Sequence, residues 1–157
     1  MLSFSGTNST TDAPTETTTD TVVVTTTPSG STPNVTIDCS SPFDEVTTPG
    51  TTIMSPNYPN NYGSGQDCQV TIRFAGSPTV LIEFDPLYNI ESHSSCGYDY
   101  LEVRDGPSAS SSLIGSKHCG RAAPAPIQST GNSMTLIFHT DSSVQKTGFK
   151  IVANPGM

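Results

Sequence analysis

The sequence is poor in positive charge and contains no tryptophan. Its 157 residues include 6 Lys and Arg against 14 Asp and Glu, which gives a formal net charge of −8 at pH 7. Nucleic-acid binding depends on Lys and Arg contacts to phosphates, so this balance argues against a nucleic-acid partner. It suits cations or basic proteins. The length is that of one small domain together with a segment outside its core.

The sequence also lacks the features of a membrane span and of a signal peptide. No segment approaches the roughly 18 apolar residues that a transmembrane helix requires. Residues 1–20, MLSFSGTNSTTDAPTETTTD, have neither the basic start nor the long apolar run of a secretory signal. We therefore expect no transmembrane segment in this chain. Taken alone, these absences would suggest a cytosolic protein.

The cysteines indicate a different compartment. They are even in number and widely spaced, and no two of them form the Cys-x-x-Cys motif of zinc and redox sites: Cys39, Cys68, Cys96 and Cys119. Two disulfide bonds in an oxidising compartment are the better interpretation, and four free buried thiols are the alternative. The missing signal peptide then predicts that the sequence is a piece of a longer secreted protein or ectodomain.

The composition changes near residue 38. Residues 1–38 consist largely of Thr, Ser and Pro, and contain too few large apolar side chains to offset the entropy of ordering. We expect a disordered linker there, similar in composition to O-glycosylated mucin-like stalks. Asn8 and Asn34 each begin an Asn-x-Thr sequence, which makes both of them candidate N-glycosylation sites of a glycoprotein.

From Cys39 onward, short alternating segments predict an all-β domain. Apolar side chains recur at every second residue in four segments: Val70 to Phe74, Val80 to Phe84, Met134 to Phe138 and Phe149 to Ala153. This period buries one face of a strand. Stretches rich in Gly, Pro and Asn separate the segments, and no helical period persists over three turns. We therefore predict an antiparallel β-sandwich of two sheets.

No enzyme motif is visible in the sequence. His93, His118 and His139 are scattered, and no His-Glu-x-x-His sequence pairs two of them. The stretch GNSMT lacks the second glycine of a nucleophile elbow, and the HTD sequence that begins at His139 is accompanied by no marked nucleophile. We therefore expect a protein without catalytic residues.

Asp99 is unusual because it falls in a segment that has the pattern of a buried strand. In strand alternation its side chain is in step with Leu101 and Val103, so it should lean toward the interior. A lone buried carboxylate is costly, and residues 74–103 contain no Lys or Arg to pair with it. A cation can serve instead, since calcium prefers several carboxylate and carbonyl oxygens, which loops at one end of a sandwich can bring together.

Four stretches occur in a characteristic order: IMSPNYPNNY, CQVTI, YNIESHSSCGYDYLEVRDG and HCGRAAPAPIQSTGNSMTLIFHTDSSVQKTGF. With the four cysteines, they resemble a CUB domain over residues 39–154. CUB domains are extracellular jelly-roll-like sandwiches of complement proteases, developmental metalloproteases and endocytic receptors. The sequence departs from the family at Val70, where Trp is usual, and at Gly63, where Pro is usual. The resemblance implies sequential disulfides, Cys39–Cys68 and Cys96–Cys119.

The resemblance also implies a calcium site in the acidic loops. Glu91, Asp99 and Asp141 align with the acidic ligands of calcium-binding CUB domains. Ser143 and Val144 fall where the family adds oxygens, mainly from the backbone. Asn or a similar polar residue is usual at the latter position, so a side-chain ligand is lost there. In CUB domains without calcium, the first of these acids would be a solvated loop acid and the third a turn former.

The function implied by the resemblance is that of a secreted or extracellular, non-catalytic protein-binding module. Calcium-ordered acidic loops would receive a Lys or Arg of a partner protein. Tyr58 matches the tyrosine that supports the acidic cluster by hydrogen bonding, so the expected partner-binding residues are Tyr58, Glu91, Asp99 and Asp141. The alternatives are an accessory domain of a larger extracellular enzyme, such as an astacin-like metalloprotease, and a structural arm beside a lectin domain. The remaining acids of the strand region are expected to be solvated: Glu83, Asp85, Glu102 and Asp105.

Overall fold

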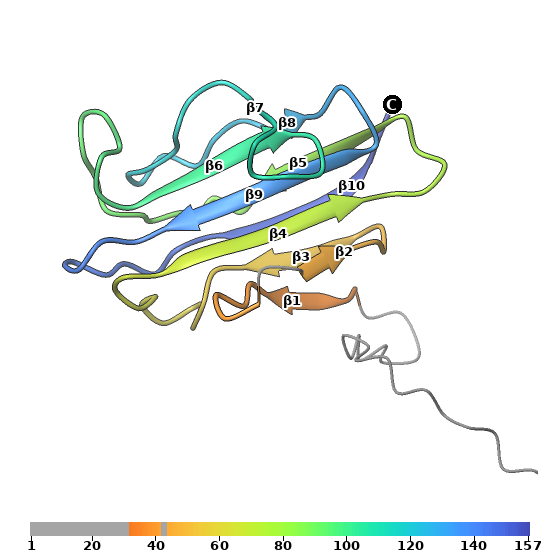
Figure 1. Cartoon of the computed structure of the whole chain (residues 1–157). Coiled ribbons are helices and arrows are strands. Elements are labelled where there is room, and N and C mark those ends of the chain that lie inside the picture. The colour runs from red at the N-terminus through yellow and green to blue at the C-terminus, as the bar shows by residue number, and fades with distance from the viewer. Residues whose placement is uncertain (1–31, 42–43) are drawn as a thin grey trace, which may run out of the picture.

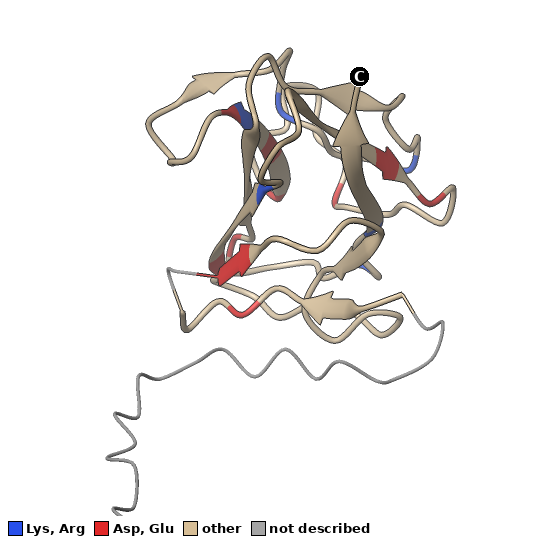
Figure 2. Cartoon of the chain, turned by 90° about the vertical axis from the view of Figure 1, so that its right-hand side faces the viewer, with Lys and Arg blue, Asp and Glu red and all other residues tan. Residues whose placement is uncertain are grey.

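The computed structural model describes residues 32–41 and 44–157, which form two five-stranded sheets packed face to face (Figure 1). The first sheet contains, in spatial order, β1 (Asn34–Thr36), β3 (Thr51–Met54), β10 (Lys150–Gly156), β5 (Thr79–Phe84) and β8 (Ile127–Gln128). The second contains β2 (Asp44–Val46), β4 (Asp67–Arg73), β9 (Ser133–His139), β6 (Tyr100–Asp105) and β7 (Ser112–Leu113). In the view turned by 90°, the sheets appear as two separate layers (Figure 2).

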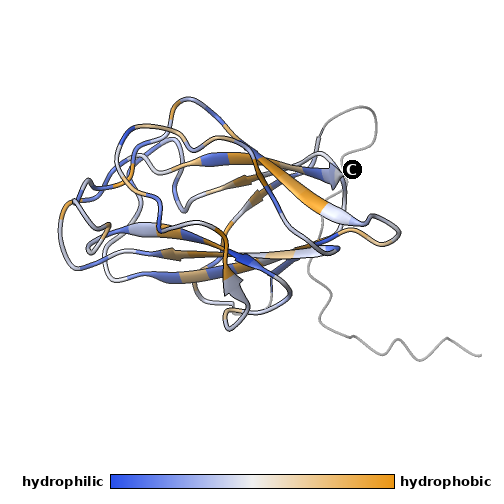
Figure 3. Cartoon of the chain, turned by 90° about the horizontal axis from the view of Figure 1, so that it is seen from above, coloured by the Kyte–Doolittle hydropathy of each residue, from blue (hydrophilic) through white to orange (hydrophobic). Residues whose placement is uncertain are grey.

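Alternating side chains of the long strands fill the space between the sheets. In the β4–β9 pair, Val70 lies opposite Leu136 and Ile72 lies opposite Met134, and all four side chains are fully buried. Hydrophobic and hydrophilic residues alternate along the strands (Figure 3). Each large apolar side chain buried in this way contributes about 1.5–3 kcal/mol. The predicted two-sheet sandwich is confirmed, and the core lies between its layers.

The sheets are mixed, whereas the sequence predicted antiparallel sheets. β1 runs parallel to β3, and β2 runs parallel to β4, while the other pairs are antiparallel. Both parallel strands are three residues long and lie at the edge of a sheet. Such short strands offer too little alternation for their direction to be predicted from the sequence.

The folded domain begins before Cys39. Residues 34–36 pair with β3, and the side chain of Ile37 is in the core with 2% of its surface exposed. The described strands therefore extend to the N-terminal side of the domain start predicted at residue 39. At the other end, β10 continues to Gly156, beyond the predicted limit of residue 154. Residues 1–31, the rest of the predicted linker, lie outside the described residues, as does Asn8.

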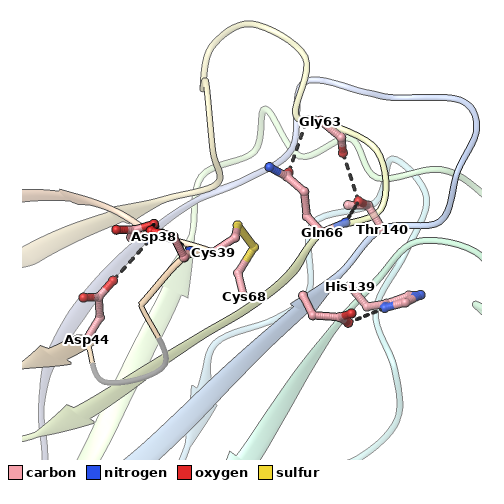
Figure 4. The surroundings of a disulfide bond; sticks show 10 residues. Asp38, Cys39, Asp44, Gly63, Gln66, Cys68, His139 and Thr140 are labelled. Carbon is pink, nitrogen blue, oxygen red and sulfur yellow. Dashed lines mark hydrogen bonds and ion pairs between the residues drawn. A yellow bond between two sulfur atoms is a disulfide. The ribbon is translucent and has the colours of Figure 1, made fainter.

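Both disulfide bonds have the predicted pairing. Cys39 bonds to Cys68, which connects the segment after β1 to β4 (Figure 4). Cys96 bonds to Cys119 and connects the loop before β6 to the segment after β7. With 29 and 23 residues of sequence separation, each bond stabilises the fold by roughly 3–4 kcal/mol in the chain-entropy description.

Among the residues that the structure describes, no helix has the length and apolar character of a membrane span.

Candidate functional site

Three carboxylates meet at one end of the sandwich. Glu91 lies in the connection between β5 and β6, Asp99 immediately precedes β6, and Asp141 follows the end of β9. One carboxylate oxygen from each residue lies within 4.8 Å of the others. The connections 85–99 and 140–149 lie together at the left-hand end of Figure 1. The structure thus brings together the three acids that the sequence singled out.

Backbone pairing holds these loops against each other. Asn89 forms a two-way backbone bridge with Gly148, and the fully buried Ile90 forms one with Gly120. Gly148 has a φ of 83°, and a Cβ at this position would collide with the side chain of Ser55. Only glycine fits this close approach in the left-handed region. Glu91 therefore follows a backbone segment that is fixed on both sides.

Asp99 is fully buried, as its place in the strand alternation predicted. Its side chain has 0% exposure, like those of Leu101 and Val103. The Tyr62 hydroxyl donates a hydrogen bond to Oδ2 at 2.6 Å, and the Asp141 amide donates one to Oδ1 at 2.7 Å. These bonds offset part of the cost of burying a carboxylate, and they fix the orientation of Asp99.

Tyr62 is the tyrosine that supports the acidic cluster. Its hydroxyl donates to Asp99 and accepts a hydrogen bond from the Glu91 amide at 3.1 Å. The ring packs edge to face on Phe138 in the core, with centroids 5.1 Å apart. Burial raises the pKa of the Tyr62 hydroxyl, and the hydrogen bond to Asp99 raises it further. The group therefore stays protonated and remains a donor.

The hydrogen-bonding role predicted for Tyr58 thus belongs to Tyr62. Tyr58 lies in a different environment, near Lys150. The pKa of Lys150 is raised, mainly by its hydrogen bond to and charge interaction with Asp85, with a smaller contribution from Tyr58. The two tyrosines are four positions apart in SPNYPNNY, so the sequence offered two candidates. The turn between them decides which hydroxyl reaches the cluster.

Glu91 has a carboxylate oxygen without a partner. Its Oε2 atom is buried and makes no hydrogen bond among the described residues. Burial raises the pKa of Glu91, and the charges of Asp99 and Asp141 raise it further, while Lys146 and His93 act in the opposite direction. An unsatisfied buried oxygen beside two like charges is costly unless a cation joins them.

Asp141 also shapes its own loop. Its Oδ1 accepts hydrogen bonds from the Ser143 amide at 2.8 Å and from the Ser143 hydroxyl at 3.3 Å. This is the Asx-type turn considered as an alternative role for Asp141, and it coexists with the position of the carboxylate in the cluster. The Asp141 carbonyl in turn accepts a hydrogen bond from Gly65 at 2.7 Å.

The loop after Asp141 contains the other two predicted ligands, Ser143 and Val144. Val144 has a φ of 52° and is 48% exposed. The left-handed region is unfavourable for a β-branched residue and is tolerated much better by Asn. The replacement of the family's usual Asn by Val144 therefore has a conformational cost as well as a chemical one.

The three acids form a donor set that suits a hard cation. The ion pairs of the described residues involve other acids, and none of them includes Glu91, Asp99 or Asp141. Carboxylate oxygens without nitrogen or sulfur donors favour calcium or magnesium over zinc or copper. The residues present therefore fit a calcium ion.

At the opposite end of β6, the carboxylate of Asp105 has hydrogen-bond partners for both of its oxygens. Both oxygens of Asp105 accept hydrogen bonds from Thr130, one from the amide at 2.8 Å and one from the hydroxyl at 2.9 Å. Glu102, between the two ends, was expected to be solvated but is only 7% exposed. Arg104 and Lys117 form ion pairs with Glu102 and cover it. These acids have partners of their own.

The histidines lie in separate surroundings. His139 pairs with Asp67, which precedes the disulfide-bonded Cys68 (Figure 4). The His118 ring lies near the ring of Phe84, with centroids 6.3 Å apart. His93 lies in the loop between Glu91 and Asp99, where sequence reasoning gave it no role. Its position beside two acids of the cluster was the signal that could have drawn attention to it.

The candidate glycosylation site Asn34 lies on the edge strand β1. Asn34 and Thr36 are both exposed and alternate with the half-buried Val35, so they share the outer face of the strand. Both residues of this sequon that matter for glycosylation are therefore accessible.

Comparison with known proteins extends these observations. The CUB domain family matches residues 39–152. The chain is 45% identical over 98 residues to a bone morphogenetic protein 1 homolog of Strongylocentrotus purpuratus. It is 41% identical over 101 residues to neuropilin-2 of Homo sapiens. The alignments cover 62% and 63% of this chain but 15% and 10% of those relatives, so the chain spans a small part of their length.

Solved structures share the fold. The CUB1-EGF-CUB2 region of human MASP-1/3 matches with a TM-score of 0.65 and 30% identity, covering 72% of this chain and 42% of that one. The MASP-1 CUB2 domain bound to Ca2+ matches with a TM-score of 0.63 and 30% identity, covering 71% of this chain and 96% of that one. CUB domains are interaction modules of extracellular proteins. From the matched family, the two-sheet sandwich and the paired disulfides, the chain belongs to the CUB domain family.

Proposed function

We propose that this chain is an extracellular, non-catalytic protein-binding module in which Glu91, Asp99 and Asp141 hold a calcium ion. The observation that supports the proposal most is the buried, unpartnered Oε2 of Glu91 beside two further carboxylates. A solved relative with the same fold is described as bound to Ca2+. Ser143 and Val144 would supply further oxygens from the loop after Asp141.

When bound, calcium supplies positive charge that neutralises the mutual repulsion of the three acids. The protein's own residues prepare the site. Tyr62 and the Asp141 amide orient the carboxylate of Asp99. The turn at Ser143 orients Asp141. An ordered acidic loop end would then present its remaining carboxylate oxygens to a partner.

The partner class that suits this end of the domain is an extracellular protein with an accessible Lys or Arg. Hydrogen bonds between a carboxylate and an ammonium or guanidinium group are short and strong. The relatives are several times longer than this chain, which is compatible with an accessory binding role within a larger extracellular protein or enzyme. We also propose that Asn34 bears N-linked glycan, which deglycosylation followed by mass measurement would detect.

Binding to immobilised poly-L-lysine at physiological salt tests the recognition step. Wild type should be retained in calcium and released in chelator, because the loops lose their shared ion. Asp99→Asn should bind weakly in both conditions. Asp105→Asn is the matched control, since it removes the same charge at the other end of β6 and should behave like wild type.

Acetylated poly-L-lysine controls for the ammonium group and should retain none of these proteins. If Asp99→Asn binds poly-L-lysine as tightly as wild type, recognition lies elsewhere on the sandwich. If chelator leaves the wild-type retention unchanged, the ion has no part in recognition.

A further inference from the structure

The loop between Glu91 and Asp99 closes around the imidazole of His93. Three donors converge on Nδ1 of this ring: the Ser95 amide at 3.3 Å, the Ser95 hydroxyl at 3.0 Å and the Gly97 amide at 3.2 Å. The His93 carbonyl also accepts a hydrogen bond from the Cys96 amide at 3.1 Å. His93 therefore accepts hydrogen bonds from the backbone amides of Ser95, Cys96 and Gly97.

The donors determine which ring nitrogen has the lone pair. Backbone amides can only donate, so Nδ1 of His93 must accept when the Ser95 and Gly97 bonds are formed. The neutral ring then has its proton on Nε2. His93 thus acts in this loop as a side-chain acceptor for amides that have no partner in a strand or helix.

Packing adds to the hydrogen bonds. The His93 ring lies against Tyr98, with centroids 4.3 Å apart. A Cβ at Gly97 would come within 3.3 Å of the His93 ring, so the missing side chain allows the Gly97 amide to approach. Cys96, which immediately precedes Gly97, has a φ of 50° and is fixed by its disulfide bond to Cys119. The loop is compact, with His93 at its centre.

The two acids that flank this loop are anchored to different extents. Asp99 is held by the Tyr62 hydroxyl and the Asp141 amide. The backbone of Glu91 is bound through its amide to Tyr62, but its carboxylate Oε2 has no partner among the described residues. On its N-terminal side, Glu91 follows residues that are fixed by bridges to Gly148 and Gly120. On its C-terminal side, the loop of residues 92–98 supplies the further constraint on where the Glu91 carboxylate lies relative to Asp99.

We propose that His93 is a positioning residue for the acidic cluster. Its Nδ1 acceptor fixes the loop over residues 92–98 and thereby sets the separation of the Glu91 and Asp99 carboxylates for a calcium ion. The inference rests on the proposed calcium function. His93 acts through the two acids and is not itself a ligand.

Three substitutions separate the acceptor from the bulk of the ring. His93→Asn keeps an acceptor, because Oδ1 of Asn is as many bonds from the backbone as Nδ1 of His. His93→Gln has the same amide group with its acceptor one bond further out. His93→Leu keeps apolar bulk against Tyr98 and removes the acceptor.

Two measurements on the full chain test the proposal: calcium affinity by calorimetry, and amide hydrogen exchange of Ser95 and Gly97 in chelator. His93→Leu and His93→Gln should bind calcium about tenfold more weakly, the scale seen when outer-shell partners of a metal site are removed. Their Ser95 and Gly97 amides should exchange faster than in wild type. His93→Asn should restore both properties to near the wild-type values.

The outcomes distinguish this inference from the proposed function. Wild-type affinity and wild-type exchange in both His93→Leu and His93→Gln would overturn the role of His93. If His93→Leu does not fold, the comparison of His93→Gln with His93→Asn decides, since both variants are polar and differ by one methylene. If wild type binds no calcium, the calcium function falls and the positioning role for the ion falls with it. The exchange of Ser95 and Gly97 then still decides whether the ring fixes the loop.

Discussion

The middle of the sandwich and its acidic end are held together in different ways. In the middle, apolar side chains such as Val70 and Leu136, which are neighbours on adjacent strands of one sheet, are buried with 0% exposure. Burial of this kind is non-directional and needs no ion. At the acidic end, three carboxylates lie close together and one oxygen has no partner among the described residues. The apolar core therefore stabilises the fold, whereas the three carboxylates would form the binding site.

Tyr62 connects the two regions. Its ring is part of the core beside Phe138, whereas its hydroxyl bonds to Asp99 and to the Glu91 amide. The position of the hydroxyl is therefore fixed by packing, and the acids are oriented by a rigid group. Substitutions in the core, at this junction and in the loops should have distinct effects on stability and on calcium binding.

The largest effect is expected in the core. Leu136→Ala should lower the free energy of unfolding by about 2–5 kcal/mol, because it leaves a cavity between the sheets. Leu87→Ala makes the same chemical change at a side chain that is 73% exposed, and should stay within about 0.5 kcal/mol of wild type. Urea denaturation in chelator and in calcium measures both. A calcium-dependent gain in stability that disappears in Leu136→Ala would contradict the separation of the two regions.

The next largest effect is expected at the junction. Tyr62→Phe should cost about 1.5–3 kcal/mol, since it removes a hydrogen bond to a buried charged group. It should also weaken calcium binding, because Asp99 loses one of its two anchors. Tyr58→Phe is the matched control and should change neither property. Equal effects of the two substitutions in urea denaturation would argue against the role assigned to Tyr62.

A smaller gain is expected in the loop after Asp141. Val144→Asn should raise the free energy of unfolding by about 1 kcal/mol, because Asn tolerates the left-handed backbone better than a β-branched residue. Val144→Ala should raise the free energy of unfolding by less, since Ala lacks the local hydrogen bonding of Asn. Thermal unfolding in chelator compares the three proteins. A loss of stability in Val144→Asn would show that the loop is not limited by its backbone conformation.

The smallest effect is a pH dependence at His118. Burial lowers the pKa of the His118 ring, whose Nε2 is buried without a hydrogen-bond partner among the described residues. As the pH falls, the His118 ring is therefore protonated first in the unfolded chain, where its pKa is about 6.5. The contribution to stability is complete above that value and is lost as the pH falls toward the lower pKa of the folded state. In chelator, the melting temperature of wild type should fall more between about pH 7.5 and pH 5.5 than that of His118→Gln. An equal fall in both would assign the pH dependence to other groups.

Regular parts of the fold could be predicted from the sequence because they repeat a physical pattern. Apolar residues recur at every second position of the strands around Val70, Ile82 and Leu136, and these three side chains are fully buried as that period predicts. Asp99 could be predicted to be buried for the same reason. β1 could not, because three residues in a Thr-rich segment give no period, and its pairing with β3 is a contact between distant segments.

Features that depend on neighbouring segments also escaped prediction. Glu102 points away from the core between Leu101 and Val103, yet Lys117 from beyond β7 covers it together with Arg104. The choice of Tyr62 as the supporting tyrosine depends on where a loop places its hydroxyl. The local sequence predicts which side chains alternate between the two faces of a strand, whereas tertiary packing determines the contacts of Glu102 and Tyr62.

Calcium titration of the full chain tests the central claim, that Glu91, Asp99 and Asp141 hold calcium, most directly. Extracellular modules bind calcium with dissociation constants of about 0.1–1 mM. At ten times that constant, binding adds about 1.4 kcal/mol to the free energy of unfolding. The melting temperature of wild type and of Asp105→Asn should then rise by a few degrees in calcium relative to chelator, while that of Asp99→Asn should not change. A wild-type protein that melts at the same temperature in millimolar calcium and in chelator would contradict the account.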